Sequence, residues 1–438
     1  MNDLSYISTP VTSINGEITV PGDKSISHRS IILGAIAKGT SHIKGFLDGE
    51  DCIATLNAFR AMGVVIEGPV QQELVIHGVG KYGLSRPQQT IDCGNSGTSM
   101  RLLAGLLAAQ SFDSKLSGDS SLLKRPMRRI AKPLTQMGAE IRTTDDKPPL
   151  YIKGGKSLQG IDYVLPEASA QVKSSILLAA LYAKGATSVS ENGISRDHTE
   201  RMLKTFSYPL YQSNNKITVT ADGELQGTDI SVPGDISSAS FFIVAATIIP
   251  GSEVLIRNVG INPTRTGVLH ILAEMGANIA ILNQRQEGGE LVADLRVKYA
   301  QLQGIKIPSA MVPIAIDEFP ILFIAAACAQ GQTVLSGAKE LRLKESDRIG
   351  VMAEGLKKLG LTVQEYEDGI MIQGGSILGG VVESKGDHRI AMSFAIAGAL
   401  AKGSVTILNC ANVATSFPTF VKTANELHLS IKEENKNV

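Results

Sequence analysis

Six stretches of the chain repeat one short pattern, and this repeat constrains the fold more than any other feature of the sequence. AMGVVIE, QMGAEIR, TFSYPLY, EMGANIA, KLGLTVQ and ELHLSIK align at Gly63, Gly138, Ser207, Gly276, Gly360 and His428. These positions follow one another at intervals of about 68 to 84 residues, as expected of repeated structural units. Each stretch is typical of an amphipathic helix that ends at a small residue and leads into a strand with alternating apolar residues.

A second series of six segments has the same spacing. It comprises SIILGAIAKGT, RLLAGLLAAQS, SILLAALYAKGAT, SFFIVAATIIPGS, PILFIAAACAQGQT and AMSFAIAGALAKGS, and glycine ends five of the six. Because these segments are apolar on nearly every side, we expect six buried helices. Each unit would then contain a strand, a buried helix, a strand, an amphipathic helix and a pair of strands, in that order.

The phrase VPGD occurs twice, at residues 20–23 and 232–235, and indicates how the six units are grouped. Six units could close as one ring, stack as a solenoid or divide three plus three. The doubled phrase favours the division, because the chain would leave one domain near Pro21 and re-enter it near Pro233. We therefore predict an α/β protein of two domains, each with three βαβαββ units. Residues 1–22 and 234–438 would form a discontinuous domain, and residues 23–233 an inserted domain.

The composition narrows the class of partner. Lys plus Arg and Asp plus Glu number 42 each, which argues against binding nucleic acid or an anionic membrane through bulk charge. The cysteines are scattered and indicate neither a disulfide framework nor a zinc site, which fits a reducing cytoplasm. The first residues lack the pattern of a signal peptide, and the longest apolar runs are too short to span a bilayer.

Basic residues stand at the starts of several of the buried helices. They are Lys24, Arg29, Arg101, Lys173 and Arg389. A cation in the first turn opposes the helix dipole by roughly 0.3 to 1 kcal/mol when exposed. Each residue alone is more often a solvated charge, but several at equivalent positions indicate bound anions, because helix starts also bind phosphate through free N–H groups. The basic cluster KRPMRR contains a proline suited to a helix start, and with 5% aromatic residues and no Trp we disfavour nucleic acid.

Two acidic motifs stand apart from this basic set. In IDEFPILF, Asp317 and Glu318 precede a buried helix, where capping explains them as well as catalysis does. In LRLKESDRIG, a salt-bridged solvent face is the ordinary interpretation. Carboxylates beside basic residues at an anion site are also suited to proton transfer.

Ten motifs, in order from residue 21 to residue 418, resemble one known family. They are PGDKSISHR, DCGNSGTSMR, GDSSLLKRPM, ASAQVKSS, SRDHTER, NPTRTG, IDEFP, KESDR, DHRIAMSF and TSFP. Through them the chain is similar to the 5-enolpyruvylshikimate-3-phosphate synthases, the enolpyruvyl transferases of the shikimate pathway to chorismate and the aromatic amino acids. The resemblance implies an inside-out α/β barrel in each domain, with buried parallel helices and an active site in the cleft between the domains.

The resemblance also implies the reaction. The carboxyvinyl group of phosphoenolpyruvate would pass to the 5-hydroxyl of shikimate 3-phosphate through a tetrahedral intermediate, with release of phosphate. No metal or organic cofactor is implied, and we expect a cytoplasmic monomer with small-molecule substrates. Glyphosate is an expected inhibitor, because Gly97 leaves space where some tolerant relatives carry a larger residue. Arg196 in SRDHTER, in contrast, is similar to the tolerant group.

Residue by residue, the resemblance assigns two binding sets and three catalytic groups. Shikimate 3-phosphate would be bound by Lys24, Ser25, Arg29, Ser169, Ala170, Gln171, Arg196, Asp317 and Lys344. Phosphoenolpyruvate would be bound by Lys24, Asn95, Gly97, Arg125, Gln171, Arg348 and Arg389. Asp317 would accept the proton of the attacking hydroxyl, Glu345 would act near C3 of the enol, and Lys24 would donate to the departing phosphate.

Two departures and two alternatives accompany this assignment. Ala170 replaces a second serine of many relatives, so its contact would be through the backbone, and Thr415 and Ser416 stand where some relatives carry a lysine. A sister transferase acting on UDP-N-acetylglucosamine shares the fold but carries a reactive cysteine, where this chain has Ser120. A binding protein that has lost the chemistry is the second alternative, against which Asp317 and Glu345 argue.

Overall fold

The chain forms two compact units, which the computed structural model describes from residue 4 to residue 435. Unit 2 comprises Gly22–Val232 and Glu287–Glu290, and unit 1 comprises the chain up to Pro21, Pro233–Gln286 and the chain from Leu291 onward. The chain therefore passes from one unit to the other at both copies of VPGD. It does so again at the tip of one hairpin, which no sequence feature indicated.

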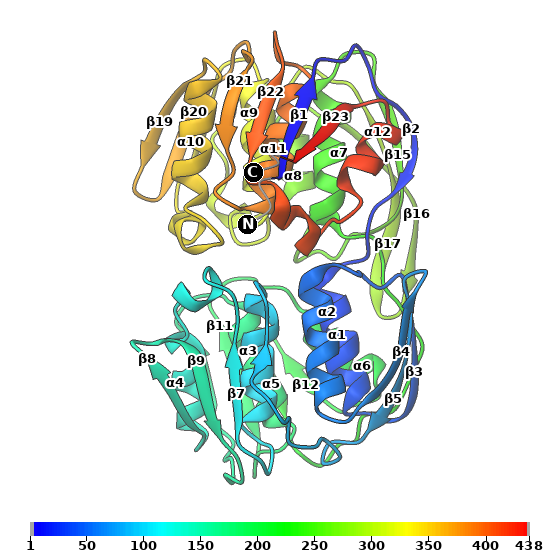
Figure 1. Cartoon of the computed structure of the whole chain (residues 1–438), viewed down its shortest axis with the longest axis vertical. Coiled ribbons are helices and arrows are strands. Elements are labelled where there is room, and N and C mark those ends of the chain that lie inside the picture. The colour runs from blue at the N-terminus through cyan, green and yellow to red at the C-terminus, as the bar shows by residue number, and fades with distance from the viewer. Residues whose placement is uncertain (1–3, 436–438) are drawn as a thin grey trace. The chain divides into compact units, whose positions relative to one another are not determined.

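Unit 2 contains three repeats, coloured blue to green in Figure 1. The first has α1 (Lys24–Ala35), β3 (Lys38–Lys44), α2 (Glu50–Ala61), β4 (Val65–Val70) and β5 (Glu73–Val79). The second has β6 (Ile91–Asp92), α3 (Gly97–Leu107), β7 (Ser114–Ser117), the short helix η1 (Leu122–Lys124), α4 (Arg128–Gln136), β8 (Glu140–Thr144) and β9 (Lys147–Lys153). The third has β10 (Asp162–Leu165), α5 (Ala170–Ala180), β11 (Thr187–Glu191), α6 (His198–Thr205), β12 (Tyr211–Ser213) and β13 (Lys216–Val219), and β14 (Ile230–Ser231) follows it.

Unit 1 begins with β1 (Leu4–Thr9) and β2 (Asn15–Thr19) and contains the other three repeats. The fourth has α7 (Ile236–Ile248), β15 (Glu253–Gly260), α8 (Gly267–Glu274), β16 (Asn278–Glu287) and β17 (Glu290–Lys298). The fifth has η2 (Ser309–Met311), α9 (Phe319–Ala327), β18 (Gln332–Leu335), η3 (Lys339–Leu343), α10 (Arg348–Lys358), β19 (Thr362–Tyr366) and β20 (Gly369–Gln373). The sixth has β21 (Gly380–Glu383), α11 (His388–Gly398), β22 (Val405–Leu408), η4 (Ala411–Thr415), α12 (Phe420–Glu426) and β23 (Ser430–Asn435).

The six aligned positions of the sequence share one backbone conformation. Each directly follows the last turn of an amphipathic helix and has a positive φ. The φ values are 87° for Gly63, 99° for Gly138, 61° for Ser207, 95° for Gly276, 88° for Gly360 and 68° for His428. A left-handed residue after the C-cap is a common helix stop, and glycine adopts it without strain. The repeat recognised in the sequence is therefore a repeated helix end.

Each repeat builds a small mixed sheet. In the third repeat, β10 lies parallel to β11, β11 pairs antiparallel with β13, and β13 pairs antiparallel with β12. The second repeat has the same order, β6-β7-β9-β8. In the fifth repeat the isolated bridges Gln303–Gln330 and Lys306–Val334 take the place of the first strand. The predicted class, βαβαββ units in an α/β protein, is confirmed.

The expectation that each βαβαββ repeat is built from consecutive strands is wrong at the two crossings, although the boundaries drawn from VPGD already separate β2 from the first repeat and β14 from the fourth. The strand β2 precedes α1 in the chain but lies parallel to β15 of the fourth repeat. Likewise β14 precedes α7 but lies parallel to β3 of the first repeat. The reason is that the chain crosses between strand and helix, so each strand stays in the unit that the chain is leaving.

The buried helices form the two cores. Every residue of α7 is buried, and α7, α9 and α11 pack on one another inside unit 1, while α3 packs along α5 in unit 2 (Figure 1). A glycine allows the second contact, because a Cβ added at Gly105 of α3 would lie 2.1 Å from the carbonyl oxygen of Ser175 in α5. In residues 4–435 every helix is too short or too polar to cross a bilayer.

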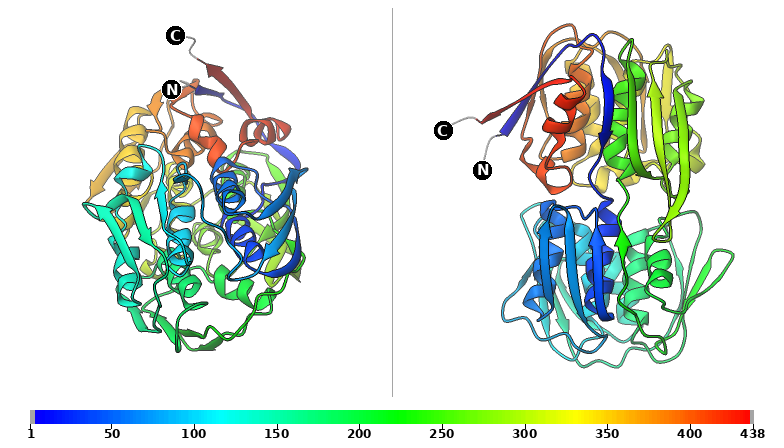
Figure 2. Two further views of the ribbon diagram at one scale, coloured as in Figure 1. Left: turned by 60° about the horizontal axis from the view of Figure 1, so that its bottom comes forward. Right: turned by 90° about the vertical axis from the view of Figure 1, so that its right-hand side faces the viewer.

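The two ends of the described chain meet in one sheet of unit 1. β1 lies between β22 and β23 and is antiparallel to both, with Leu4 opposite Asn435. The right-hand view of Figure 2 shows β1 and β23 running side by side toward the chain ends. The sixth repeat is therefore completed by the first strand of the chain.

Candidate active site

The starts of α1, α3 and α5 meet in unit 2 and bring most of the sequence-predicted basic residues together. We call this group the unit 2 cluster: Lys24, Ser25, Arg29, Asn95, Gly97, Arg101, Arg125, Ser169, Ala170, Gln171 and Arg196. Side-chain hydrogen bonds join the three helices, from Arg29 to Ser174 of α5 at 2.7 Å and from Gln171 of α5 to Thr98 of α3 at 2.9 Å. These residues cluster because α1, α3 and α5 are equivalent helices of three repeats and therefore start at the same end of unit 2.

Lys24 lies in the first turn of α1, and Arg29 lies about one turn further along the helix. Asp23 caps the helix by accepting a hydrogen bond from the Ile26 amide at 2.9 Å. The Lys24 ammonium forms an ion pair with Asp51 of α2. The cap therefore fixes the start of α1, and the ion pair with Asp51 fixes the Lys24 side chain.

Arg29 is 4% exposed and is fixed by three acceptors. Its Nε donates to Thr199 Oγ1 of α6 at 2.6 Å, Nη1 to the Ser25 carbonyl at 2.9 Å and Nη2 to Ser174 Oγ. Burial lowers the pKa of Arg29 to about 10, while the carboxylates of Glu200 and Asp23 oppose this shift and Arg196 adds to it. The guanidinium is therefore charged at neutral pH and is placed near a second cation.

The start of α3 positions Arg125. Ser96 caps this helix through a 3.0 Å hydrogen bond from the Ser99 amide. Arg125 Nη2 donates to Asn95 Oδ1 at 3.1 Å, and a Cβ added at Gly97 would lie 3.0 Å from Arg125 Nη1. Gly97 is thus the residue that lets this guanidinium lie against the helix start, and Asn95 orients it.

The start of α5 presents backbone amides. Ser169 occupies the N-cap position, but its side chain accepts no capping hydrogen bond from the backbone N–H groups of the first turn. Gln171 accepts a hydrogen bond from Arg101 of α3 through its carbonyl oxygen and donates to Thr98 through its amide. A helix start of this kind, flanked by arginines, is suited to a phosphate or carboxylate.

The prediction that Lys173 faces a bound anion is wrong. Its side chain is 2% exposed, and its Nζ lies 2.8 Å from Glu191 Oε1 and 2.8 Å from Glu200 Oε1. The anions that compensate this lysine are therefore residues of the protein. Sequence reasoning missed both carboxylates as partners of Lys173, because they follow the lysine at a distance along the chain; Glu200 lies in the motif SRDHTER, whereas Glu191 belongs to no quoted motif.

The starts of α9, α10 and α11 bring the remaining predicted residues together in unit 1. We call Asp317, Lys344, Glu345, Arg348 and Arg389 the unit 1 cluster. Arg348 is at its centre and is 1% exposed. Its Nη1 donates to Asp317 Oδ1 at 3.4 Å and its Nη2 donates to Glu345 Oε2 at 2.6 Å.

Asp387, which the sequence analysis did not single out, anchors the unit 1 cluster. It is completely buried, accepts a 2.9 Å hydrogen bond from Arg348 Nε, and caps α11 through the Arg389 amide at 2.9 Å. Burial alone would lower the pKa of Arg348, but Asp387, Glu345 and Asp317 together raise it above its usual value. Its place in the motif DHRIAMSF was the signal available for finding Asp387.

The other two cations of the unit 1 cluster lie beside Asp317. Lys344 Nζ is 3.7 Å from Asp317 Oδ1 and 3.3 Å from Glu340 Oε1. Arg389 Nη1 donates to the backbone carbonyl of Asp317 at 3.1 Å. The cluster therefore combines titratable carboxylates with cations, whereas the unit 2 cluster is predominantly cationic.

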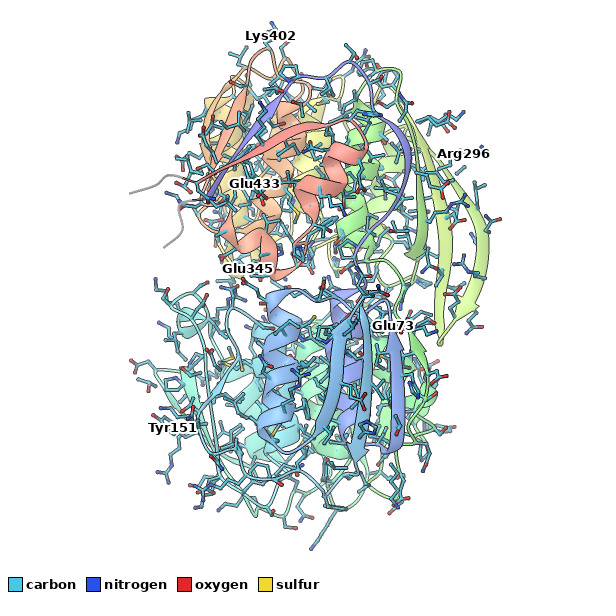
Figure 3. All side chains as sticks on the ribbon, turned by 45° about the vertical axis from the view of Figure 1, so that its right-hand side comes forward. Glu73, Tyr151, Arg296, Glu345, Lys402 and Glu433 are labelled. Carbon is cyan, nitrogen blue, oxygen red and sulfur yellow. The ribbon has the colours of Figure 1, made fainter. Side chains whose placement is uncertain are left out.

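Figure 3 shows Glu345, a member of the unit 1 cluster, at one end of its unit. Glu345 lies at the end opposite Lys402, which follows the carboxyl end of α11. The charged side chains thus gather where the buried helices start. Within residues 4–435, no group of three or more His, Cys, Asp or Glu side chains is arranged to hold a metal ion.

The second copy of VPGD has the structural role expected of it. Asp235 caps α7 by accepting from the Ser237 amide at 2.8 Å. The same carboxylate lies 3.0 Å from Arg265 Nη2, and Arg265 also lies 3.7 Å from Glu318. All four residues are buried, so this helix start is filled by the protein's own ion pairs.

Two histidines of the motifs, His28 and His198, are buried and have polar partners within the protein. His28 is fully buried, its Nδ1 lies 2.8 Å from Thr55 Oγ1, and burial together with Lys24 and Arg29 lowers its pKa well below the usual value. His198 Nδ1 lies 2.8 Å from Glu290 Oε1, at the hairpin tip that belongs to unit 2. His28 is therefore neutral at physiological pH, and His198 fastens the start of α6.

These repeats and clusters define the class of the protein as one with the enolpyruvyl transferase fold. The structure superposes on the enolpyruvyl transferase NikO from Streptomyces tendae with a TM-score of 0.82 over 100% of both chains, at 15% sequence identity. At that identity the likeness concerns the fold.

Closer relatives specify the family. A family model described as EPSP synthase (3-phosphoshikimate 1-carboxyvinyltransferase) matches residues 8–424. A 3-phosphoshikimate 1-carboxyvinyltransferase of Legionella pneumophila (strain Philadelphia 1) is 70% identical over 430 residues, covering 98% of this chain and 99% of the relative. One from Methylococcus capsulatus is 58% identical over 431 residues, with the same coverage. The solved EPSP synthase from Acinetobacter baumannii has a TM-score of 0.89 at 56% identity, covering 99% of this chain and 100% of that one. The chain belongs to the EPSP synthase family.

Proposed function

We propose that this chain transfers the carboxyvinyl group of phosphoenolpyruvate to the 5-hydroxyl of shikimate 3-phosphate, releasing phosphate. Membership of the EPSP synthase family carries the proposal. The unit 2 cluster supports it, because both substrates are anions that repel each other in the absence of cations. A converging set of arginines and helix starts reduces that repulsion and orients the reacting atoms.

We assign the acceptor substrate mainly to unit 2. Arg29, Arg196, Ser25, Lys24 and the start of α5 at Ser169, Ala170 and Gln171 would hold shikimate 3-phosphate, with Asp317 and Lys344 contributed by unit 1. Ala170 would contribute its backbone. The supporting observation is that Arg29 is locked in place by Thr199 and Ser174, which removes the entropy loss that a mobile arginine would suffer on binding.

We assign phosphoenolpyruvate to cations of both units. Arg125, Gly97, Asn95, Gln171 and Lys24 would bind it from unit 2, and Arg348 and Arg389 from unit 1. The active site of this proposal is therefore completed only when the two clusters come together on the substrates, in a cleft between the units. Closure would also exclude water from the reaction.

The proposed chemistry uses three groups, Asp317, Glu345 and Lys24. Asp317 takes the proton of the 5-hydroxyl as its oxygen adds to C2 of phosphoenolpyruvate, and Glu345 delivers a proton to C3. The tetrahedral intermediate then expels phosphate, protonated by Lys24, while Glu345 removes a proton from C3 and restores the double bond. Asp317 and Glu345 are suited to these roles because both accept hydrogen bonds from one fixed residue, Arg348.

Further parts of the proposal concern inhibition, assembly and location. Glyphosate would compete with phosphoenolpyruvate, since glycine at position 97 leaves the space beside Arg125 open. Undiminished activity at saturating glyphosate would contradict this. The enzyme would act as a monomer in the cytoplasm, where its four cysteines, all thiols in the structure, remain reduced.

Phosphate release from phosphoenolpyruvate tests the reaction directly. The assay is run in parallel with shikimate 3-phosphate and with UDP-N-acetylglucosamine as acceptor. We expect release with shikimate 3-phosphate alone. Release only with the nucleotide sugar would transfer the assignment to the sister enzyme, and release with neither would indicate a binding protein without activity.

A further inference from the structure

A buried ion cluster links the start of α5 to the segment that carries Arg196. Lys173 contacts Glu191 and Glu200 at 2.8 Å each, and all three side chains are almost completely buried. Burial alone would lower the pKa of Lys173, but the two carboxylates outweigh it and raise the pKa above its usual value. The lysine is thus charged and holds two carboxylates that would otherwise repel each other.

Glu191 links Lys173 to the segment that follows β11. It is the last residue of β11, and its second oxygen, Oε2, accepts a 2.6 Å hydrogen bond from Ser195 Oγ. Its Oε1 also accepts from the Ser195 amide at 3.4 Å, and its backbone carbonyl accepts from Asn215 at 2.9 Å. Residues 192–197, which connect β11 to α6, are therefore tied at Ser195 to a carboxylate that Lys173 fixes.

Arg196 directly follows Ser195 in the sequence. Its charge lowers the pKa of Arg29, so the two guanidinium groups lie within electrostatic reach of each other, while Glu200 has the opposite effect on Arg29. Glu200, which Lys173 contacts, therefore offsets part of the effect of Arg196 on Arg29.

The energetics favour a positional role for this cluster. Buried ion triads are often no more stabilising than apolar side chains of equal size, because desolvation offsets their attraction. A cluster that merely filled the core would have a simpler apolar alternative. What an ionic cluster supplies in addition is a fixed direction for each of its hydrogen bonds.

We propose that Lys173, Glu191 and Ser195 are positioning residues, which hold Arg196 where it binds the 3-phosphate of the acceptor substrate. This inference rests on the proposed function, since it assumes that shikimate 3-phosphate is the acceptor. Lys173 fixes Glu191, Glu191 fixes Ser195, and Ser195 fixes the backbone of the next residue. Without the chain of contacts, the backbone before Arg196 would lose its link to Glu191, and binding would include the cost of ordering it.

Ser195→Ala is the mildest test, because it removes one hydroxyl and leaves the buried charges in place. We expect the KM for shikimate 3-phosphate to rise about fivefold to twentyfold. The KM for phosphoenolpyruvate, measured at saturating acceptor, and kcat should stay within about twofold of the unmodified enzyme. Ser195→Thr restores a hydroxyl and should recover most of the affinity.

Ser188→Ala is the matched control. Ser188 lies three residues before Glu191 on the same strand, and its hydroxyl is hydrogen-bonded to Thr218 at 2.9 Å and not to the segment that carries Arg196. Its KM values should match those of the unmodified enzyme. Glu191→Gln keeps the size of the side chain but removes its charge, and should weaken acceptor binding in the same direction as Ser195→Ala.

The outcomes separate this inference from the proposed function. If the unmodified enzyme neither binds nor converts shikimate 3-phosphate, the proposed function fails and the inference fails with it. If the unmodified enzyme is active but Ser195→Ala behaves like Ser188→Ala, only the positioning inference is overturned. A uniform rise in both KM values together with a lower melting temperature would indicate a merely structural bond, and would also overturn it.

Discussion

Replacing Arg348 by methionine should both destabilise unit 1 and disable the unit 1 cluster. The guanidinium donates to Asp387 at 2.9 Å, to Glu345 at 2.6 Å and to Asp317 at 3.4 Å. Asp387 is 0% exposed, so the change would leave a buried carboxylate without its main cation. Glu345 and Asp317 are partly exposed and can regain water, so most of the effect comes from Asp387.

The expected magnitude follows from this burial. Breaking a buried pair by removing one partner costs about 3 to 5 kcal/mol. For a domain of this size each kcal/mol lowers Tm by about 2 to 4 °C, which gives a fall of about 6 to 20 °C. At a temperature where the variant is still folded, the KM for phosphoenolpyruvate should rise about 10-fold to 100-fold, since a charge-assisted hydrogen bond contributes about 1.5 to 3 kcal/mol.

Scanning calorimetry and initial-rate kinetics measure the two effects separately. Arg265→Met is the matched control, because Arg265 is equally buried in unit 1 and pairs with Asp235 and Glu318 at a helix start that no ligand is expected to occupy. It should lower Tm by a similar amount while changing the KM for phosphoenolpyruvate much less. An Arg348→Met protein with unchanged Tm would refute the argument that Asp387 depends on this arginine.

Three more changes test other parts of the structure. Gly97→Ala would place a methyl group 3.0 Å from Arg125 Nη1. We therefore expect the KM for phosphoenolpyruvate to rise about threefold to tenfold and glyphosate inhibition to weaken. Unchanged kinetics would show that the Arg125 guanidinium can move aside without loss of binding. Asp317→Ala should lower kcat by about 10² to 10⁴ while shikimate 3-phosphate binding stays measurable by calorimetry, and near-normal turnover would exclude Asp317 as the proton acceptor. His428→Gly should raise the free energy of unfolding, measured with urea, by about 0.5 to 1 kcal/mol, because the exposed histidine is held at a φ of 68°. Gly276→Ala should lower it, because the alanine would have to adopt a φ of 95°. Equal effects of both changes would argue against backbone strain.

The repeat was predictable because it is local. Each aligned position sits at the end of a helix and has to adopt a left-handed conformation, so glycine recurs there and marks the period. The buried helices were equally predictable, because a segment that packs on all sides must be apolar on all sides. Both features are set by residues close together in the sequence.

The boundaries drawn from VPGD put β2 in the discontinuous domain and β14 in the inserted one, but no signal in the sequence indicated which strands they pair with. β2 pairs with β15, with Asn15 opposite Glu253, and β14 pairs with β3, with Ile230 opposite Ile43. The strand sequences themselves carry no mark of the partner. Only the position of the crossing, between strand and helix, determines which sheet receives them. Pairing over that distance is a property of the assembled unit.

The partners of the basic residues at the helix starts were likewise predictable only in part. Arg29 and Lys173 both stand in the opening turns of buried helices, so the same electrostatic argument predicted an anion for each. For Lys173 the anions are Glu191 and Glu200, which tertiary packing brings to it from a strand and another helix. A sequence pattern indicates that a charge needs a partner, but the fold decides whether that partner is a side chain or a ligand.

The pairing of β1 with β22 and β23 has a consequence for synthesis on the ribosome. Residues 22–232 of unit 2 are continuous and emerge early, so their sheets can form while the rest of the chain is still being translated. β1 is translated well before its partners, which begin at Val405 and Ser430. At the usual rates of translation it waits roughly 20 to 80 s with its backbone unpaired and Tyr6, buried in the finished sheet, exposed to solvent. During that interval β1 is an unpaired strand that is open to aggregation, and it can pair only after residues 405–435 have been translated.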